Sequence, residues 1–361
     1  MKTKFVLSNR SFSHAIQTRR GPLILLFYDG YEWRLERGAF ARLKAQLHRF
    51  ARFTYRTLRG KQVRTGFYSQ FINLCAALTA AGCDVRVNNY ALALKNPHYP
   101  IGVSGYPTVI AKLPLTNPAI FGPGDFGMPD TFASIACKSQ FGSLICFCEW
   151  IGKIYEATCP GKITKWFAGI EPKNWQLGGA GAKDIDCLIY DKIRWDRERL
   201  VPILIDDLCK TICSRGLSFE IIRYGEHAQS EYRKLLARSR SLVFLCEHET
   251  QGLAYQEALA ANIPVFAWDE GVLMDPALRR FAPADLKVSS VPYFSDECGV
   301  RFKISTLHDD FDRFLGGLEL YRPRNFVEAN LSPNESARRY LEAYFSLGVS
   351  ESNSLTKRVS R

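Results

Sequence analysis

The sequence contains no long apolar run. No stretch approaches the roughly 18 uncharged apolar residues that a membrane-spanning helix needs. The opening residues, MKTKFVLSNRSF, lack the apolar core and the cleavage site of a signal peptide. C-x-x-C pairs are also missing, and the 11 cysteines stand mostly inside apolar runs. Such cysteines are typical of buried, reduced thiols rather than of zinc ligands, so we expect a cytoplasmic protein.

Motifs for nucleic-acid binding are missing as well. The chain has a formal net charge of +12, but it also carries 36 acidic residues. Because a basic surface identifies a nucleic-acid-binding protein only together with a recognisable motif, we expect no nucleic-acid partner. The 361 residues, of which 47% are apolar and 23% charged, are typical of a globular protein with two α/β domains.

The basic residues are concentrated in one segment. Within residues 34–64, ten lysines and arginines stand against Glu36 alone. Apolar residues recur there at helical spacing, namely Phe40, Leu43, Leu47, Phe50 and Leu58. This pattern predicts a basic amphipathic helix, which is typical of binding to an anionic membrane surface or to a partner's groove. The structural alternative is a helix that packs its apolar side into the core and exposes a basic face.

Residues 241–271 form the most informative stretch of the chain. Residues 242–246 are the continuous apolar run of a strand buried on both faces. A polar loop follows at 247–252, and an Ala/Leu-rich helix is expected at 253–261. Residues 263–267 begin the next strand. The sequence therefore predicts one β-loop-α-β unit of a parallel sheet.

Two carboxylates lie in this unit. Glu249 is in the loop at the carboxyl end of the first strand, where open α/β sheets bind ligands. Glu257 is in the helix among apolar neighbours, so its carboxylate needs hydrogen-bond donors. The hydroxyl groups of a ligand would supply them, and so would a neighbouring arginine or a backbone amide.

The spacing of these residues resembles a known signature. Residues 249–265, ETQGLAYQEALAANIPV, are similar to the E-G-F-G-L-x-x-x-E-A motif and its G-x-P-V continuation in retaining GT-B glycosyltransferases of the family-4 type. Thr250 and Gln251 replace Gly and Phe, and Asn262 replaces the last Gly. The resemblance implies an α/β protein of the GT-B class, with two Rossmann-like, doubly wound domains facing across a cleft.

The resemblance also assigns roles to residues. Glu257 would accept hydrogen bonds from the ribose hydroxyls of a nucleotide-sugar donor, and Glu249 would lie beside the transferred sugar. The donor would also be bound by the loop residues Thr250, Gln251, Gly252 and Leu253, whose amides complete an anion site. No cofactor is implied, because the nucleotide sugar is a substrate.

Cations for the leaving diphosphate are expected at the start of the second domain. Residues 185–190, IDCLIY, predict a strand, and Lys192 and Arg194 follow it. Fixed cations stabilise a diphosphate as its bond breaks, and the family has an Arg and a Lys at this place. Arg197 and Arg199 are alternatives, and each of these cations could instead be a solvated surface charge. With cations in this role we expect no metal, and we identify no Asp-x-Asp metal motif.

The first domain shows the same alternation with one interruption. Residues 22–27 predict a buried strand, but the basic segment stands where a phosphate-binding turn would follow. That turn is expected at Gly66, ahead of a helix over 67–81, where Gly66 either contacts the donor or serves packing only. Further strands are expected at 107–111 and 143–147, with a Gly/Pro/aromatic loop at 120–127 between them.

Composition divides the chain into segments. We expect a first domain over 1–175 with the basic insertion near 34–64, a Gly/Ala linker over 176–183 and a donor-binding domain over 184–330. A helix over 331–349 resembles the last helix of GT-B enzymes, which packs back on the first domain. Residues 350–361 are polar and basic, and we expect them to form a disordered tail.

These features together predict a transferase. The expected reaction moves a hexosyl group from a nucleotide sugar to a glycan or lipid-linked acceptor with retention, and it takes place at the inner face of the membrane if the basic helix binds there. The alternative from another class is a catalytically inactive GT-B protein that binds the nucleotide sugar as a sensor or scaffold. An epimerase of the same fold is a second enzyme candidate, which the acid and base residues do not support.

Overall fold

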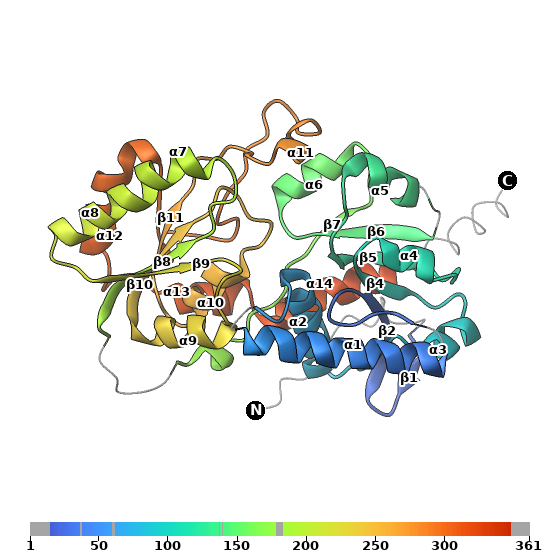
Figure 1. The fold of residues 1–361 in the computed structure, drawn as a ribbon. Coiled ribbons are helices and arrows are strands. Elements are labelled where there is room, and N and C mark those ends of the chain that lie inside the picture. The colour runs from blue at the N-terminus through green and yellow to red at the C-terminus, as the bar shows by residue number, and fades with distance from the viewer. Residues whose placement is uncertain are drawn as a thin grey trace. The chain divides into compact units, whose positions relative to one another are not determined.

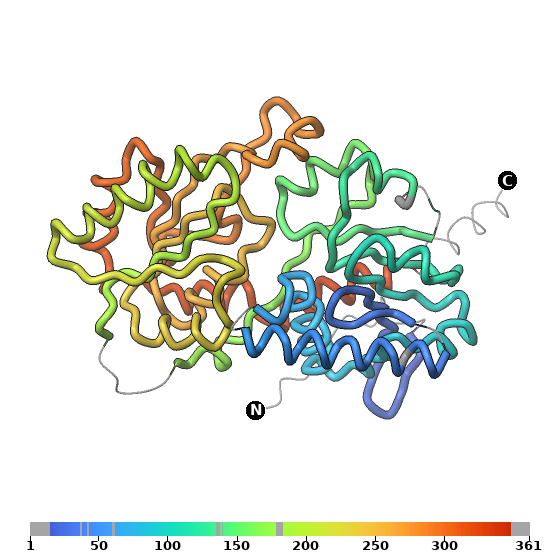
Figure 2. The backbone as a smooth tube through the Cα atoms, viewed as in Figure 1, coloured from blue at the N-terminus to red at the C-terminus, as the bar shows by residue number. Residues whose placement is uncertain are grey.

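The chain folds as two compact units (Figures 1 and 2). This computed structural model describes residues 15–36, 38–59, 62–136, 138, 140–177 and 183–347. The first unit is formed by Met1–Arg52, Arg64–Gly169 and Pro333–Arg361, and the second by Phe53–Val63 and Ile170–Ser332. The chain therefore leaves the first unit at Gly169 and returns to it at Pro333. Most of the expected 176–183 linker and the 350–361 tail lie outside the described residues.

A seven-stranded sheet forms the centre of the first unit. Its strands run in the order β1-β2-β4-β5-β6-β7. Strand β3 also pairs with β2, outside this order. All neighbours are parallel except the antiparallel pair of β1 and β2. The strands are β1 (Gln17–Thr18), β2 (Gly21–Asp29), β3 (Asp84–Val87), β4 (Ile101–Gly105), β5 (Ala119–Gly124), β6 (Phe141–Cys146) and β7 (Ile163–Lys165). The strand predicted at 22–27 is confirmed as β2, which is buried from Leu23 onward.

Helices of the first unit cover this sheet and connect its strands. They are α1 (Ala39–Leu58, whose last turns fall in the second unit), α2 (Gly66–Ala80), α3 (Tyr90–Lys95), α4 (Thr108–Lys112), α5 (Pro129–Ala136), α6 (Glu149–Glu156) and α14 (Pro333–Ser346). The helix predicted at 67–81 is confirmed as α2. Helix α14 is held within the first unit by buried bonds: the Trp166 indole donates to the Ser336 carbonyl at 2.9 Å, and the Leu25 amide donates to the Tyr344 hydroxyl at 3.0 Å.

Two short segments differ from the sequence prediction. The expected strand at 107–111 is helix α4, because β4 has already ended at Gly105 and Pro107 starts a helical turn. A short apolar run does not distinguish a buried strand from a buried helix. The expected loop at 120–127 contains strand β5, which is buried throughout. A Cβ at Gly124 would lie 2.3 Å from the Gly105 carbonyl oxygen, so glycine serves close strand approach here rather than a turn.

The second unit is built on a five-stranded parallel sheet. Its strand order is β12-β11-β10-β8-β9. The strands are β8 (Ile185–Asp191), β9 (Phe219–Arg223), β10 (Ser239–Leu245), β11 (Val265–Trp268) and β12 (Gly299–Phe302). Numbered from β8, this is the 2-1-3-4-5 order of a doubly wound fold. The predicted β-loop-α-β unit is confirmed as β10, a loop, α10 (Leu253–Ala260) and β11.

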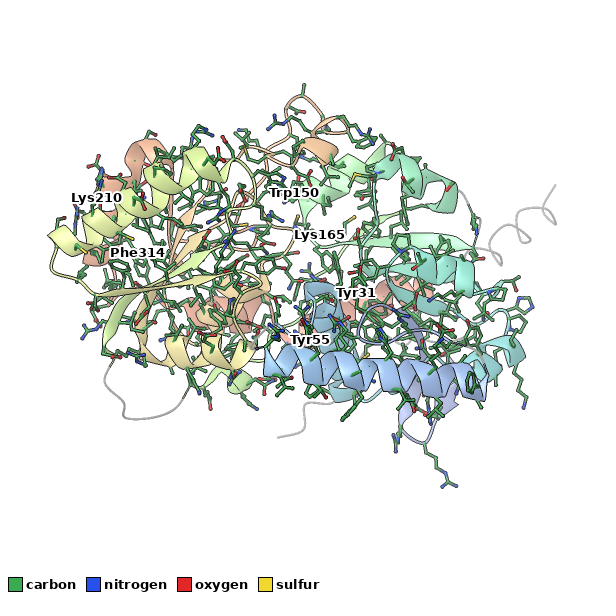
Figure 3. The ribbon with its side chains drawn as sticks, viewed as in Figure 1. Tyr31, Tyr55, Trp150, Lys165, Lys210 and Phe314 are labelled. Atoms are coloured by element: carbon green, nitrogen blue, oxygen red, sulfur yellow. The ribbon has the colours of Figure 1, made fainter. Side chains whose placement is uncertain are left out.

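The remaining helices cover both faces of the second sheet. They are η1 (Pro172–Trp175), α7 (Arg197–Val201), η2 (Pro202–Asp206), α8 (Asp207–Ser214), α9 (Gln229–Arg238), α11 (Pro276–Arg279), η3 (Ile304–Thr306), α12 (Leu307–Gly316) and α13 (Pro323–Asn330). On one face, a buried core joins β8, β10, β11 and β12 to α7, η2, α8 and α12. Phe314 of this core is labelled in Figure 3. Within it Phe266 stacks on Phe302 with ring centroids 4.1 Å apart. Within the described residues, every helix is too short or too polar to cross a membrane.

Candidate active site

The order of the second sheet brings two loops together. Strands β8 and β10 are parallel neighbours, and Asp191 at the end of β8 is in register with Leu245 at the end of β10. From this point the strand order runs in opposite directions, so the loops after β8 and β10 begin side by side at a topological switch point. Ligands of open α/β sheets bind at such points. Lys192 and Arg194 follow β8, and Glu249 follows β10.

An ion pair joins the two loops. The Lys192 ammonium contacts the Glu249 carboxylate, and both side chains are mostly buried. Burial opposes charge on Glu249, but Lys192 and Arg194 outweigh it and hold the pKa of Glu249 below its ordinary value. Burial also opposes charge on Lys192, yet Glu249 raises its pKa overall. Both groups are therefore charged at neutral pH.

Arg194 supplies a second cation at the same place. Its guanidinium donates to the His248 carbonyl at 2.7 Å and lies 4.2 Å from the centre of the Trp195 ring. The side chain is 36% exposed, so it remains accessible to solvent. Its Nε also lies 3.8 Å from the Glu247 carboxylate, so the site combines a cation paired with Glu249 and a partly exposed cation paired with Glu247.

Glu247 fixes the loop that carries these cations. Its buried carboxylate accepts from the Arg194 amide at 2.8 Å and from the Trp195 amide at 2.9 Å. The sequence analysis did not identify this residue. A signal for it does exist in the sequence, because a carboxylate directly after a fully buried strand needs hydrogen-bond donors from its surroundings.

His248 is a further residue that the sequence analysis missed. Its ring stacks on Trp195 with centroids 4.9 Å apart, and its Nε2 accepts from the Asp275 amide at 3.3 Å. Burial, with the positive charge of Arg194, lowers the pKa of His248 to about 4. The imidazole is therefore neutral at physiological pH and adds no charge beside Glu249.

Glu257 lies in a different electrostatic environment from Glu249. Its carboxylate accepts from the Gln229 amide group at 3.1 Å. Burial raises the pKa of Glu257 to about 8, and Gln229 and Arg233 only partly oppose the rise. After burial itself, the charges of Glu257 and Glu249 both raise the pKa of Tyr190.

The loop between the two glutamates is shaped by a required glycine. Gly252 has φ of +77°, and a Cβ there would lie 2.3 Å from the Tyr255 ring. Gln251 is buried, and its side chain donates to the Gln256 side chain at 3.0 Å, so this residue packs the loop. Thr250 and Leu253 are partly exposed. Donor binding by these four residues stays a prediction.

Gly66 belongs to the first unit. It is the first residue of α2, and nothing lies within 4 Å of a Cβ built on it, so packing does not require glycine there. The buried Glu32 carboxylate accepts from the Thr65 amide at 2.6 Å and from the Tyr28 hydroxyl at 3.2 Å. A carboxylate of the protein itself thus lies at the start of this helix, where anions are favoured. A donor contact of Gly66 stays a prediction.

The alternative cations are engaged elsewhere. Arg197 forms a two-pronged pair with Asp191 at 2.8 and 2.9 Å, and Arg199 pairs with Asp196 at the surface.

Two Asp-x-Asp pairs do occur in the chain. They are Asp184 and Asp186 at the amino end of β8, and Asp310 and Asp312 on α12, and each of the four is paired with an arginine. In the described part of the chain no group of three or more His, Cys, Asp or Glu side chains is arranged to hold a metal ion.

A cavity of about 360 Å³ lies on the second unit away from these loops. Its lining comes from the start of β12 and from α12 and the turn after it, and includes Arg301, Arg313 and Tyr321. The candidate residues follow the carboxyl ends of β8 and β10 instead, at the other end of the parallel strands.

Comparison with known proteins shows similarity of structure. No protein-family model matches the chain, and no curated protein sequence matches it. The structure of sucrose-phosphate synthase from Thermosynechococcus elongatus aligns with 91% of this chain and 100% of its own, at 12% identity and a TM-score of 0.55. The lipopolysaccharide outer core galactosyltransferase WaaB aligns with 90% and 99%, at 9% identity and a TM-score of 0.52. The chain spans 54% of TarM, at a TM-score of 0.45 and 12% identity.

These similarities define the class of fold. The alignments with sucrose-phosphate synthase and with WaaB cover nearly the whole of this chain and of each neighbour. Each unit of this chain has a doubly wound α/β sheet. The protein has the GT-B fold of glycosyltransferases, with two Rossmann-like units, as the residue pattern at 249–265 predicts.

The Lys192–Glu249 pair can be tested without knowledge of the function. Lys192→Met removes the ion-pair partner of a mostly buried carboxylate, so we expect a loss of about 3 kcal/mol in the free energy of unfolding. Adding Glu249→Gln removes the remaining charge and should recover most of that loss. Urea unfolding of the wild type, both single variants and the double variant measures the coupling.

The exposed pair of Arg199 and Asp196 gives a matched control. Arg199→Met should cost less than about 1 kcal/mol, because surface pairs contribute little. A coupling energy near zero between Lys192 and Glu249 would contradict the buried pair.

The raised pKa of Glu257 predicts a pH-dependent stability. Between an unfolded value of about 4.3 and the folded value of about 8, the folded protein holds a proton that the unfolded chain releases. The stability of the wild type relative to Glu257→Gln should therefore be highest at about pH 4 and fall as the pH rises to about 8. Thermal unfolding of both proteins across this range measures the difference, and a flat difference would show that the pKa is not raised.

Proposed function

We propose that this protein is a glycosyltransferase that moves a sugar from a nucleotide-sugar donor to a glycan or lipid-linked acceptor. The GT-B fold supports this class of reaction. The observation that carries the proposal is the arrangement of Lys192, Arg194 and Glu249 at the switch point of the second sheet. Two cations there, of which Arg194 is partly exposed, suit a leaving diphosphate next to a reacting sugar.

The donor diphosphate is proposed to lie against Lys192 and Arg194. Arg194 offers a planar guanidinium that can bind two phosphate oxygens, and its partial exposure leaves it reachable. Glu247 supports it, because its carboxylate holds the Arg194 backbone in place. Lys192 is proposed to stabilise negative charge as the bond to the sugar breaks, and its partner Glu249 is proposed to lie beside the sugar.

The ribose is proposed to bind Glu257. An ionised carboxylate accepts hydrogen bonds from two neighbouring hydroxyls, and the Gln229 amide holds one of its oxygens at 3.1 Å. Because the pKa of Glu257 is raised to about 8 by burial, hydroxyl donors would favour its ionised form and release a proton on binding. Amides around Gln251, Gly252 and Leu253 complete the anion site, and Gly66 of the first unit is the remaining proposed donor contact.

Retention of configuration and independence of metal are parts of the same proposal. Front-face attack would let the leaving phosphate take the proton of the acceptor hydroxyl as the new glycosidic bond forms. The two cations supply the charge that a metal supplies in other transferases. The aspartates of both Asp-x-Asp pairs are paired with arginines, which supports a reaction that does not use them as metal ligands.

The transferred group is proposed to be a hexosyl group, and the acceptor a polysaccharide or envelope glycan. The galactosyltransferase among the structural neighbours is named for transfer of such a group in lipopolysaccharide. A lipid-linked acceptor would require the protein to work in the cytoplasm at the inner face of a membrane.

A donor-binding protein without turnover is the second candidate. The observation that favours it is Gln251, which replaces a family Phe and is turned inward against Gln256. A changed loop of this kind is compatible with binding without catalysis. Release of nucleoside diphosphate distinguishes the two candidates.

The experiment begins with thermal shift against a panel of nucleotide sugars. One donor should stabilise the protein, by about 2.7 kcal/mol at a hundred times its dissociation constant. Glu257→Gln should weaken this effect. With that donor, Arg194→Met should slow release of nucleoside diphosphate by about 100-fold or more, because charge stabilisation in the transition state is lost.

Arg199→Met is the matched control, since Arg199 pairs with Asp196 at the surface of the same segment. It should leave both donor binding and release unchanged. If the donor binds but no nucleoside diphosphate is released, not even by slow transfer of the sugar to water, the non-catalytic candidate is favoured. Failure of every nucleotide sugar to stabilise the protein would overturn the proposed donor site.

A further inference from the structure

Helix α1 carries its apolar side chains on the outside. Its large apolar residues are between 54% and 82% exposed, namely Phe40, Leu43, Leu47, Phe50, Phe53, Tyr55 and Leu58. Phe40, Leu43, Leu47, Phe50 and Leu58 recur every three or four residues or at a multiple of that spacing, so they form one stripe along the helix. The core-packing alternative for this helix is therefore wrong. Figure 3 shows side chains projecting along α1, with Tyr55 labelled.

The opposite face of α1 is the one that contacts the protein. Ala41, Ala45, Arg52 and Arg56 share that face by helical spacing, and all four are partly buried. The small alanines allow close approach of the helix. The long arginine stems cover apolar surface there, as such side chains commonly do.

Specific contacts fix this orientation. The Arg49 guanidinium donates to the Tyr68 hydroxyl at 3.3 Å and lies 5.5 Å from the centre of the Trp33 ring. The Arg52 guanidinium lies 4.0 Å from the Glu32 carboxylate, and the Arg56 side chain donates to the Gln62 carbonyl at 2.6 Å. Rotation of α1 to bury its apolar stripe would break these contacts. The outward stripe is thus a feature that the folded chain maintains.

An apolar stripe of this length is unusual on a protein surface. Single exposed residues such as Leu94 and Leu320 need no explanation, but a contiguous patch identifies an interaction site. With 20 residues, α1 is about 30 Å long. The stripe runs over nearly all of that length, from Phe40 to Leu58.

The positive charge of α1 indicates which kind of partner the apolar stripe would bind. No acidic residue occurs between Arg37 and Arg64, whereas Lys44 and Arg59 are exposed on the helix and just after it. A second copy of the chain would bring two basic helices into contact and incur repulsion. A partner that combines an apolar layer with negative charge along about 30 Å fits instead, and an anionic lipid bilayer has both properties.

We propose that α1 docks the protein on an anionic lipid bilayer. The stripe from Phe40 to Leu58 enters the boundary between headgroups and acyl chains, and the flanking basic residues contact lipid phosphates. The helix lies in the plane of the membrane surface rather than across it. This proposal does not depend on the donor chemistry of the second unit, although it suits a lipid-linked acceptor.

Vesicle flotation of the full chain tests the proposal. The protein should float with vesicles of phosphatidylcholine mixed with phosphatidylglycerol, and should stay with the soluble fraction when the vesicles are phosphatidylcholine alone. Raised salt should weaken the binding, because the electrostatic part is screened. Equal binding to both vesicles, or no binding to either, would overturn the proposal.

Matched variants identify the surface. The triple variant Leu43→Gln, Leu47→Gln, Phe50→Gln should bind anionic vesicles at least about tenfold more weakly. Leu94→Gln with Leu320→Gln removes exposed apolar groups elsewhere and should bind as the wild type does. Lys44→Glu should weaken binding more than Lys95→Glu, which changes an exposed lysine on α3.

Two further measurements keep the outcome clear. Circular dichroism and thermal unfolding should be unchanged in the triple variant, because the three positions are exposed. Light scattering should show the same mass for the wild type and the triple variant. A dimer that is lost in the triple variant would assign the stripe to self-association and overturn the membrane proposal. Donor-induced thermal shifts remain a separate readout, so failure of either proposal can be distinguished from failure of the other.

Discussion

The ion pair between Lys192 and Glu249 is the interaction on which the candidate site depends. Burial of either charged group alone would carry a large desolvation penalty, and each group holds the other in its charged form. The pair can form only because β8 and β10 are parallel neighbours whose ends are in register. Glu247 then fixes the chain after β8 and presents Arg194. The order of the sheet thus sets the electrostatics of the site.

Two glutamates separated by eight positions differ strongly in this site because their surroundings differ. Burial acts on both carboxyl groups. Lys192 and Arg194 outweigh it at Glu249 and lower its pKa, whereas Gln229 and Arg233 do not outweigh it at Glu257, whose pKa rises to about 8. A group that stays charged suits a position beside developing charge. Glu257, which would gain charge when the hydroxyl groups of a ligand bind, suits ligand binding. The roles proposed for the two glutamates follow this difference.

The sequence predicted the parts of the fold whose signals are local. The apolar run at 242–246, the helix that follows it and the helix at 67–81 are confirmed, because length and periodicity identify them. Strand β5 and helix α4 were missed, since the role of Gly124 depends on a neighbouring strand and the run at 107–111 is too short to decide. The contacts of Glu247 and His248, and the outward stripe of α1, also depend on tertiary packing that no local pattern shows.

A crystal structure with a bound nucleoside diphosphate tests the central claim most directly. The account predicts the diphosphate within hydrogen-bond distance of Lys192 and Arg194, with the ribose hydroxyls on the Glu257 carboxylate. The Lys192–Glu249 contact should open or be shared as phosphate oxygens arrive. A nucleotide bound instead in the cavity at Arg301 and Arg313, with Lys192 still closed on Glu249, would contradict the account.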